Sequence, residues 1–317
     1  MPDCTQFRAV DVAVAIPTYC RDQVLLDTIY ACQSQDEPPG EIAIVDQTPV
    51  HDEATEQALS AMQKRGTIRW IRLPHPSIPC AMNIALLSTA KPLVLFLDDD
   101  VVPAKGLIDA HVRAHNEFDA WAVVGQIIQP WQKPCNVSRP SAQQMLTADF
   151  DFPFHSTHPC WLRNAMAGHM SVRRDLTIRV GGFDENFMGV AYRFETEFAR
   201  RVIRAGGQIR FCPEASIQHL RAARGGTRTE GNHLASASPN HGVGDYYFAM
   251  LQGWSTETAA YMAWRMIREV ATRFHLRHPW YIPVKLLGEM RAIRWASQLK
   301  RQGQALLQLP MESPESN

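Results

Sequence analysis

Hydrophobic and polar residues follow a regular order in the first hundred residues of the chain. Short runs of β-branched and aliphatic residues predict buried strands at 10–16, 41–45, 67–73 and 93–97. Between these runs, apolar residues at helical spacing predict helices at 23–34, 53–64 and 80–89. Because strands that alternate with helices form right-handed crossovers, we expect a parallel sheet with ligand-binding loops at its carboxyl edge.

The order is looser after residue 100. Residues 121–129 and 208–212 predict two more strands, and residues 195–205 predict an amphipathic helix. The segment 130–159 is rich in Pro, Ser and aromatic residues, which predicts an extended loop. The Gly-, Ser- and Asn-rich segment 221–244 predicts a mobile loop.

The last part of the chain is helical and basic by its pattern. Two helices are predicted from Trp254 onward, with a break near His278 and Pro279. Residues 255–303 hold nine Lys or Arg and three Glu, although the formal net charge of the whole chain is zero. A basic amphipathic helix with Trp residues is typical of peripheral contact with an anionic membrane. The alternative is a packing helix or an oligomer contact.

Three consecutive carboxylates follow one of the predicted strands. Residues 93–97 are all apolar, which indicates a strand buried on both faces, and Asp98, Asp99 and Asp100 stand where it must end. Three like charges at the edge of a core are costly unless a positive group lies among them. A divalent metal is the natural candidate, because hard cations prefer oxygen ligands. The alternative is an acidic loop that binds nothing.

The composition of the 317 residues limits the classes of function. With no net charge, nothing indicates nucleic acid as a partner. The seven cysteines are scattered without CxxC spacing, so neither a zinc site nor a disulfide framework is predicted. The N-terminus has no signal-peptide pattern, and no apolar run reaches transmembrane length. We therefore expect a cytoplasmic protein, with the basic helices as a candidate contact to the inner face of the membrane.

Five separate motifs point to one family. They are IPTYCR at 16–21, Asp46 at the end of the second strand, the acidic run at 98–100, GGFDE at 181–185 and FETE at 194–197. From about Val12 to Arg228 the chain resembles the family 2 inverting glycosyltransferases with the GT-A fold. The resemblance implies transfer of a sugar from a UDP-, GDP- or dTDP-sugar, with the help of Mg²⁺ or Mn²⁺. The acceptor would be a hydroxyl of a saccharide or a lipid-linked molecule, in the synthesis of a cell-surface polysaccharide or glycolipid.

The same resemblance implies a fold and a division into domains. The fold is the α/β fold of nucleotide-diphospho-sugar transferases, GT-A, with a mostly parallel central sheet and a helical C-terminal extension. Residues 1–245 would form the glycosyltransferase domain, with a nucleotide-binding half at about 8–130 and an acceptor half at 131–245. The basic extension would be 246–317.

The resemblance also implies which residues bind the donor. They are Pro17, Thr18, Tyr19, Arg21, Asp46, Asn83, Asp98, Asp99, Arg224 and Arg228. The Pro-Thr-Tyr turn and Asp46 would hold the base, since an aromatic ring can stack on a base and a carboxylate can accept from its N–H. Arg224 and Arg228, in a Gly-rich segment, would fold over the phosphates, because guanidinium matches phosphate geometry. Met82 stands where the family often has a donor-binding Arg.

Metal and base residues follow from the same comparison. Asp100 would hold the metal, with Asp98 and His219 as further ligands, and a Lewis acid there would stabilise the departing nucleoside diphosphate. Inversion is a single displacement, so the acceptor hydroxyl needs a base on the opposite face. Glu195 stands at the family's base position, and Glu197 is the alternative base.

Two other functions compete with glycosyl transfer. A sugar nucleotidyltransferase would carry a Gly-rich phosphate loop after the first strand, where this chain has Pro-Thr-Tyr-Cys-Arg. A non-catalytic sugar-nucleotide or glycan-binding protein derived from the same fold would have lost the metal carboxylates or the base. Since the chain retains both, the sequence favours the transferase.

Overall fold

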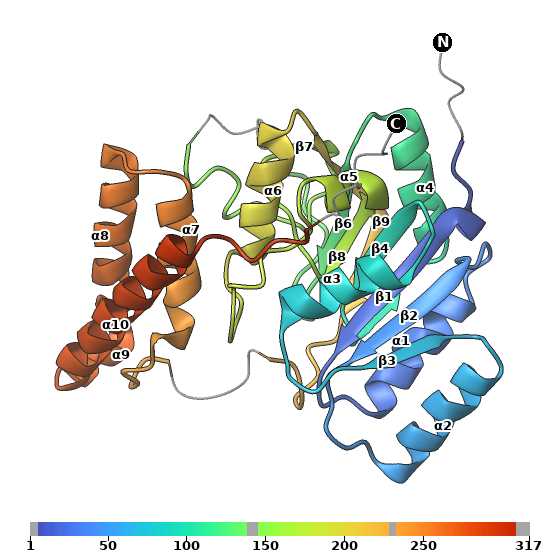
Figure 1. Ribbon diagram of the computed structural model, residues 1–317, viewed down its shortest axis with the longest axis horizontal. Coiled ribbons are helices and arrows are strands. Elements are labelled where there is room, and N and C mark those ends of the chain that lie inside the picture. Colours follow the sequence, from blue (N-terminus) through green and yellow to red (C-terminus); the bar gives the residue numbers. More distant parts are fainter. Residues whose placement is uncertain (1–5, 138–144, 228–232, 309–317) are drawn as a thin grey trace, which may run out of the picture.

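The computed structural model describes residues 6–137, 145–227 and 233–308, and within them the chain builds a mixed sheet covered by helices (Figure 1). The strand order is β3-β2-β1-β4-β8-β6-β9-β5, and β7 pairs with β9 outside this path. The strands are β1 (Val12–Thr18), β2 (Glu41–Asp46), β3 (Arg69–Arg72), β4 (Leu93–Leu97), β5 (Val101–Pro103), β6 (Ala122–Ile128), β7 (Cys160–Leu162), β8 (His169–Arg173) and β9 (Ile209–His219).

Helices connect and cover these strands. They are α1 (Gln23–Gln33), α2 (Glu53–Lys64), α3 (Ile78–Ser88), α4 (Leu107–Glu117), α5 (Arg174–Arg179), α6 (Phe194–Arg204), α7 (Val243–Leu251), α8 (Thr256–Val270), α9 (Arg273–Arg277) and α10 (Tyr281–Gln302). Two short 3₁₀ helices are η1 (Ala9–Asp11) and η2 (Pro239–His241). Within these residues no helix is both long and apolar enough to span a bilayer.

The elements predicted for the first hundred residues are all present, and their pairing is parallel. β1 lies between β2 and β4, and β3 extends the same parallel set on the far side of β2. The remainder of the sheet is mixed, because β8 enters antiparallel between β4 and β6. The α/β fold class is therefore confirmed, and the predicted parallel pairing applies to β1 to β4.

The sequence of β4 is uniformly apolar because both faces of this strand are buried. Leu93, Leu95 and Leu97 pack into a core with residues of α1, α2 and α4, while Val94 and Phe96 pack into a second core with residues of α3, α6 and α7. Side chains alternate between the faces of a strand, so a strand covered on both sides needs apolar residues at every position. The first polar residue after β4 therefore lies at the edge of the sheet.

The sheet contains more strand residues than were predicted: β9 is longer, and β5, β7 and β8 had no prediction. β9 was predicted at 208–212 but runs to His219, through an irregularity at which Gly125 pairs with Cys212 and Gln126 already pairs with Ser216. β8 was not predicted, because His169 and Ser171 look like exposed residues in the sequence. Both are buried, since histidines of α4 supply their hydrogen-bond partners.

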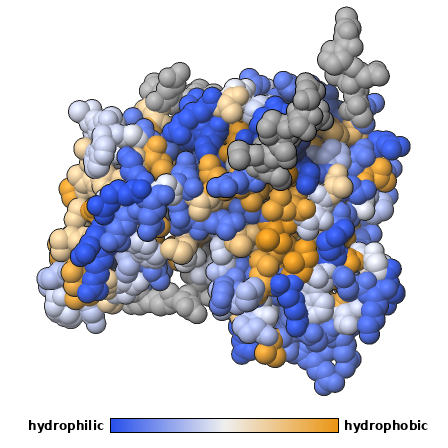
Figure 2. All heavy atoms as spheres, in the orientation of Figure 1, coloured by the Kyte–Doolittle hydropathy of each residue, from blue (hydrophilic) through white to orange (hydrophobic). Residues whose placement is uncertain are grey.

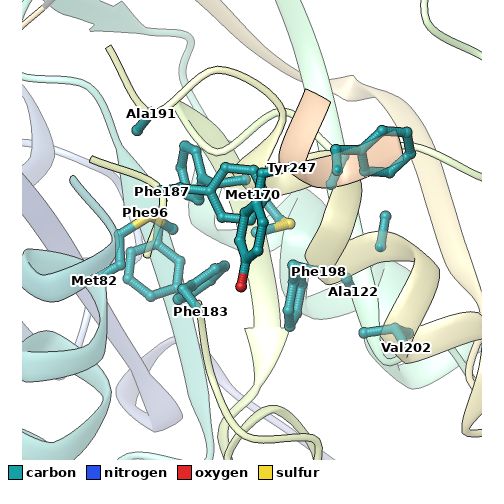
Figure 3. Close-up of a cluster of buried hydrophobic side chains, with 14 of the residues drawn as sticks. Met82, Phe96, Ala122, Met170, Phe183, Phe187, Ala191, Phe198, Val202 and Tyr247 are labelled. Atoms are coloured by element: carbon teal, nitrogen blue, oxygen red, sulfur yellow. The ribbon is translucent and has the colours of Figure 1, made fainter. Parts of the chain in front are cut away.

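The C-terminal helices share a core with the sheet. Tyr247 packs beside Phe183, Phe187 and Phe198 (Figure 3), in the same cluster of buried side chains as residues of β4 and β8. The predicted boundary between residues 245 and 246 lies inside α7. Three helices, α8 to α10, follow Trp254 instead of the two predicted. The additional break comes before α9, where the hydroxyl of Thr272 caps the new helix.

Candidate active site

The carboxyl ends of β1, β2 and β4 meet at one edge of the sheet, and a cleft of about 900 Å³ opens there. This is where ligands collect in open α/β sheets. The predicted site residues that line the cleft are Pro17, Thr18, Tyr19, Arg21, Asp98, Asp99, Asp100, Glu195 and His219. Segments from both halves of the chain therefore contribute to one cavity.

Two aspartates and a histidine form a cluster with suitable donors for a divalent cation. His219 ends β9 and pairs with Val101 of β5, which places its Nε2 3.4 Å from both Asp98 Oδ2 and Asp100 Oδ1. One potential ligand atom of each side chain lies within 4.8 Å of the others. Burial lowers the pKa of His219, but the two carboxylates outweigh this effect and raise it above its ordinary value. Two carboxylates and an imidazole fit Mg²⁺ or Mn²⁺ chemically.

Gly168 is part of this cluster because it lets the chain pass under Asp98. Its carbonyl accepts from the Asp98 N–H at 3.0 Å. A Cβ on Gly168 would lie 2.2 Å from Asp98 Oδ2, so any other residue would displace the carboxylate. The position of this possible ligand therefore depends on a glycine in the turn before β8.

Asp99 is directed away from the cluster and is bound by the turn after β1. Its carboxylate accepts from Thr18 Oγ1 at 2.7 Å and from Arg21 Nε at 3.2 Å. Arg21 also donates from Nη2 to Asp100 Oδ2 at 3.1 Å. Burial raises the pKa of Asp99 to about 7, against the opposing effects of Arg21 and Thr18. Arg21 is thus one positive group that the three clustered carboxylates require.

The loop after β9 is docked on the same turn. Arg21 donates to the carbonyl oxygens of Ala222 and Arg224, and the Gly226 N–H donates to Tyr19 O at 2.8 Å. Gly225 has a φ of +80°, and a Cβ there would meet the Cys20 carbonyl oxygen at 2.2 Å. The loop therefore covers one side of the cleft in close contact with the β1 turn.

The arginine that this loop presents to the cleft is not one of the two predicted. The Arg224 side chain is exposed and does not line the cavity, and Arg228 lies outside the described residues. Arg221 lines it instead, with its guanidinium 4.8 Å from the ring centroid of Trp131. No sequence signal indicated this pair, because both residues lie in irregular segments far apart in the chain.

Asp46, which was predicted to contact the base, does not line the cleft. Asp46 is fully buried, and its carboxylate accepts from His51 Nε2 at 2.8 Å, Trp70 Nε1 at 2.9 Å and the Thr48 N–H at 2.9 Å. These donors leave it no exposed surface. The next residue, Gln47, lines the cleft instead.

Two more predicted residues lie in the interior. Asn83 is 1% exposed and donates to Phe183 O at 2.8 Å and to Glu185 at 2.9 Å, so it holds the GGFDE segment and does not line the cleft. Glu197 is 1% exposed, pairs with Arg201 at 2.7 Å and accepts from Gln304 Nε2 at 2.8 Å. A carboxylate held in this way is poorly suited to take a proton from a substrate.

Glu195 lies in the first turn of α6 and faces the cleft. The backbone before it is unusual, because Ala191 and Arg193 both have positive φ, at 48° and 74°. The buried Arg193 side chain donates to Asp245 of α7 at 3.0 Å and lies over the Phe150 ring, 3.5 Å from its centroid. The start of α6 is thus held by a C-terminal helix.

A model of glycosyl transferase family 2 matches residues 13–174, just over half of the chain. The chain belongs to glycosyl transferase family 2. The matched part of the chain includes the β1 turn and the acidic run. A curated relative, the succinoglycan biosynthesis protein ExoM of Rhizobium meliloti (strain 1021), is 26% identical over 154 residues. That match covers 47% of this chain and 47% of ExoM, so the transferase spans about half the length of this relative.

Solved structures share the GT-A fold of the transferase. GalNAc-T7 with UDP, GalNAc and Mn²⁺ has a TM-score of 0.61 at 13% identity, over 95% of this chain and 59% of that one. Staphylococcus aureus TarS 1-349 with UDP-GlcNAc has 0.58 at 14%, over 92% of each chain. The mannosyltransferase PcManGT of Pyrobaculum calidifontis with GDP-Man and Mn²⁺ has 0.51 at 19%, over 96% and 81%. At these identities the likeness shows the fold.

Proposed function

We propose that this transferase is a metal-dependent, inverting enzyme that moves a sugar from a nucleotide diphosphate sugar to an acceptor hydroxyl. The observation that carries the proposal is that one cleft holds three side chains with suitable donors for a cation, Asp98, Asp100 and His219, together with a separate carboxylate, Glu195. A protein that only binds sugar nucleotides needs the cluster but has no use for the second carboxylate.

The donor would bind between the β1 turn and the acidic run, in the half formed by residues 8–130. A metal held by Asp98, Asp100 and His219 would neutralise charge on the diphosphate and on the leaving group. Tyr19 would stack on the base. We assign recognition of the edge of the nucleobase to Gln47 in place of Asp46. Gln47 lines the cleft, and its side-chain amide has both a donor and an acceptor. Arg221 would contact the diphosphate.

Residues 131–245 would bind the acceptor and supply the base. Glu195 would take the proton of the acceptor hydroxyl as that oxygen attacks the anomeric carbon, and the nucleoside diphosphate would leave from the opposite face. Glu197 would position α6 through Arg201 and Gln304 without contacting substrate. The names of the relatives support a UDP- or GDP-sugar donor, and that of ExoM supports polysaccharide synthesis as the setting.

Nucleotide-dependent stabilisation and transfer, measured on the same variants, test this mechanism. We expect the thermal midpoint to rise with one of UDP, GDP or dTDP only when Mn²⁺ or Mg²⁺ is present, and Asp100→Asn to abolish that rise. Glu195→Gln should keep the rise but lower transfer about 10²- to 10⁴-fold, the usual worth of a general base. Asp119→Asn, which alters an aspartate with an 89% exposed side chain, is the control and should change neither.

Two results would contradict the mechanism. Normal transfer by Glu195→Gln would remove Glu195 as the base. If no nucleotide stabilises the protein with either metal, the donor site is wrong and a glycan-binding function without catalysis is favoured.

A further inference from the structure

The C-terminal helices carry an apolar face that the described part of the chain leaves uncovered. On α8, Ala260, Ala263, Trp264 and Ile267 recur at helical spacing and are all exposed, Trp264 at 60% and Ile267 at 55%. Leu276 of α9 follows at 80% exposure. Figure 2 shows apolar residues gathered at the left-hand edge of the molecule, over α8 and α9.

The acidic residues of these helices lie mostly in the interior, and most of the basic residues lie on the surface. Inside, Glu269 and Glu289 face the buried side chains of Arg265 and Lys285 at 3.1–3.4 Å. This network uses two of the three acids in residues 255–303 and leaves only Glu257 outside it. Arg268 also pairs with Glu269, at 3.3 Å, and the basic residues that remain outside the network are Arg273, Arg277, Arg291, Arg294, Lys300 and Arg301. The outer surface of these helices is therefore strongly positive, although the chain as a whole is neutral.

We propose that the face formed by α8 and α9 docks on an anionic lipid bilayer. Trp264 and Leu276 would enter the headgroup region, together with Trp280, which is 63% exposed at the start of α10. The surrounding arginines would contact lipid phosphates. A second copy that docked through the same face would present the same positive charge and be repelled, so the charge favours an anionic surface over face-to-face self-association.

The structure narrows the membrane contact that was predicted for residues 255–303. The mixed basic and apolar residues of 282–299 all lie in α10. There Ala292, Ala296 and Leu299 are buried against the other C-terminal helices, although Leu287 and Met290 of the same helix are exposed. The most exposed apolar residues of α8 and α9 are Trp264, Ile267 and Leu276. The proposal extends the proposed function, because it places the enzyme where a lipid-linked acceptor resides.

Vesicle co-sedimentation of the full chain tests the proposal without nucleotide or metal, so its outcome is independent of the catalytic assignment. We expect binding to phosphatidylcholine vesicles that contain phosphatidylglycerol, and none to phosphatidylcholine alone. Binding should weaken as salt rises from about 0.1 to 0.5 M, since salt screens exposed charges. Trp264→Ser combined with Leu276→Ser should lower vesicle binding about 10-fold or more. Val50→Ser, which alters an 82% exposed residue distant in sequence, is the matched control.

A second pair of substitutions separates charge from apolar contact. Arg273→Gln with Arg277→Gln should weaken binding and reduce its salt dependence, with an unchanged thermal midpoint. Equal binding to both kinds of vesicle would overturn the electrostatic argument. Absence of vesicle binding would overturn the proposal, and a concentration-dependent dimer that Trp264→Ser abolishes would instead identify the face as an interface between copies.

Discussion

The buried ion pair between Arg193 and Asp245 links the start of α6 to the C-terminal helices and allows a quantitative prediction. Asp245 is fully buried and accepts from Arg193 at 3.0 Å, from Tyr261 at 2.6 Å and from Arg265. The substitution Asp245→Asn keeps the shape of the side chain and removes its charge. Arg265 would still face Glu289 at 3.3 Å, so Arg193 is the cation left without a counter-charge.

Removing one partner of a buried pair costs about 3–5 kcal/mol, because the other charge remains out of water and uncompensated. We expect Asp245→Asn to lower the free energy of unfolding by about this amount. The control is again Asp119→Asn, whose carboxylate pairs with Arg173 at 3.3 Å but is 89% exposed. An exposed pair contributes about 0–1 kcal/mol, so the control should remain close to wild type.

Urea unfolding measures the stability difference, and transfer assays on the folded variant measure its functional effect. Since Arg193 is two residues before Glu195, we expect kcat to fall more than donor affinity. The proposed donor contacts come from the segments that follow β1, β2, β4 and β9, and the hydrogen-bond partners of Asp245 lie in none of them. A stability loss within about 1 kcal/mol of the control would refute the argument about uncompensated charge. An unchanged kcat in a destabilised variant would show that the α6 start does not depend on α7.

Two further predictions concern other parts of the molecule. Gln47→Ala should weaken nucleotide diphosphate binding about 10-fold, the worth of one hydrogen bond, and an unchanged Kd by calorimetry would exclude Gln47 from base recognition. Burial lowers the pKa of both His115 and His169 to about 4, so the unfolded chain takes up these protons first as the pH falls below about 6.5. Between pH 7 and 5 each histidine should therefore lower the stability by roughly 2 kcal/mol, and Asp99 should offset about one histidine because its pKa is raised. Equal urea midpoints at the two pH values would contradict the net loss of stability.

The sequence pattern predicted correctly those parts of the fold in which the buried residues are apolar and the exposed residues are polar. β1, β2 and β4 are apolar because helices cover both faces, and their pattern needs no knowledge of the rest of the chain. β8 was not predicted because it does not follow this pattern. Its His169 and Ser171 are buried only because α4 brings His111 and His115 against them. Buried polar residues with partners distant in sequence cannot be distinguished from exposed ones by periodicity.

Among the site residues, too, those with partners distant in sequence could not be assigned from the sequence. The acidic run and the β1 turn were readable because each follows a strand end directly. Asp46 satisfies the same rule, yet His51 and Trp70 occupy its carboxylate, and only the fold shows that they reach it. Glu197 had a readable partner in Arg201, four residues later on the same helix, whereas Gln304 is more than a hundred residues away.

The contacts of α6 imply that the proposed donor site and the proposed base, Glu195, are held in place by different parts of the molecule. The acidic run and the β1 turn are fixed by the parallel strands of the first half. The helix that carries Glu195 is fixed from the C-terminal side, through Arg193 to Asp245 and through Glu197 to Gln304. Gln304 also donates to Asp184 of the GGFDE segment at 3.1 Å. Substitutions in the C-terminal contacts should therefore reduce transfer while nucleotide binding persists. If the C-terminal helices were an independent extension, the same substitutions would leave transfer unchanged.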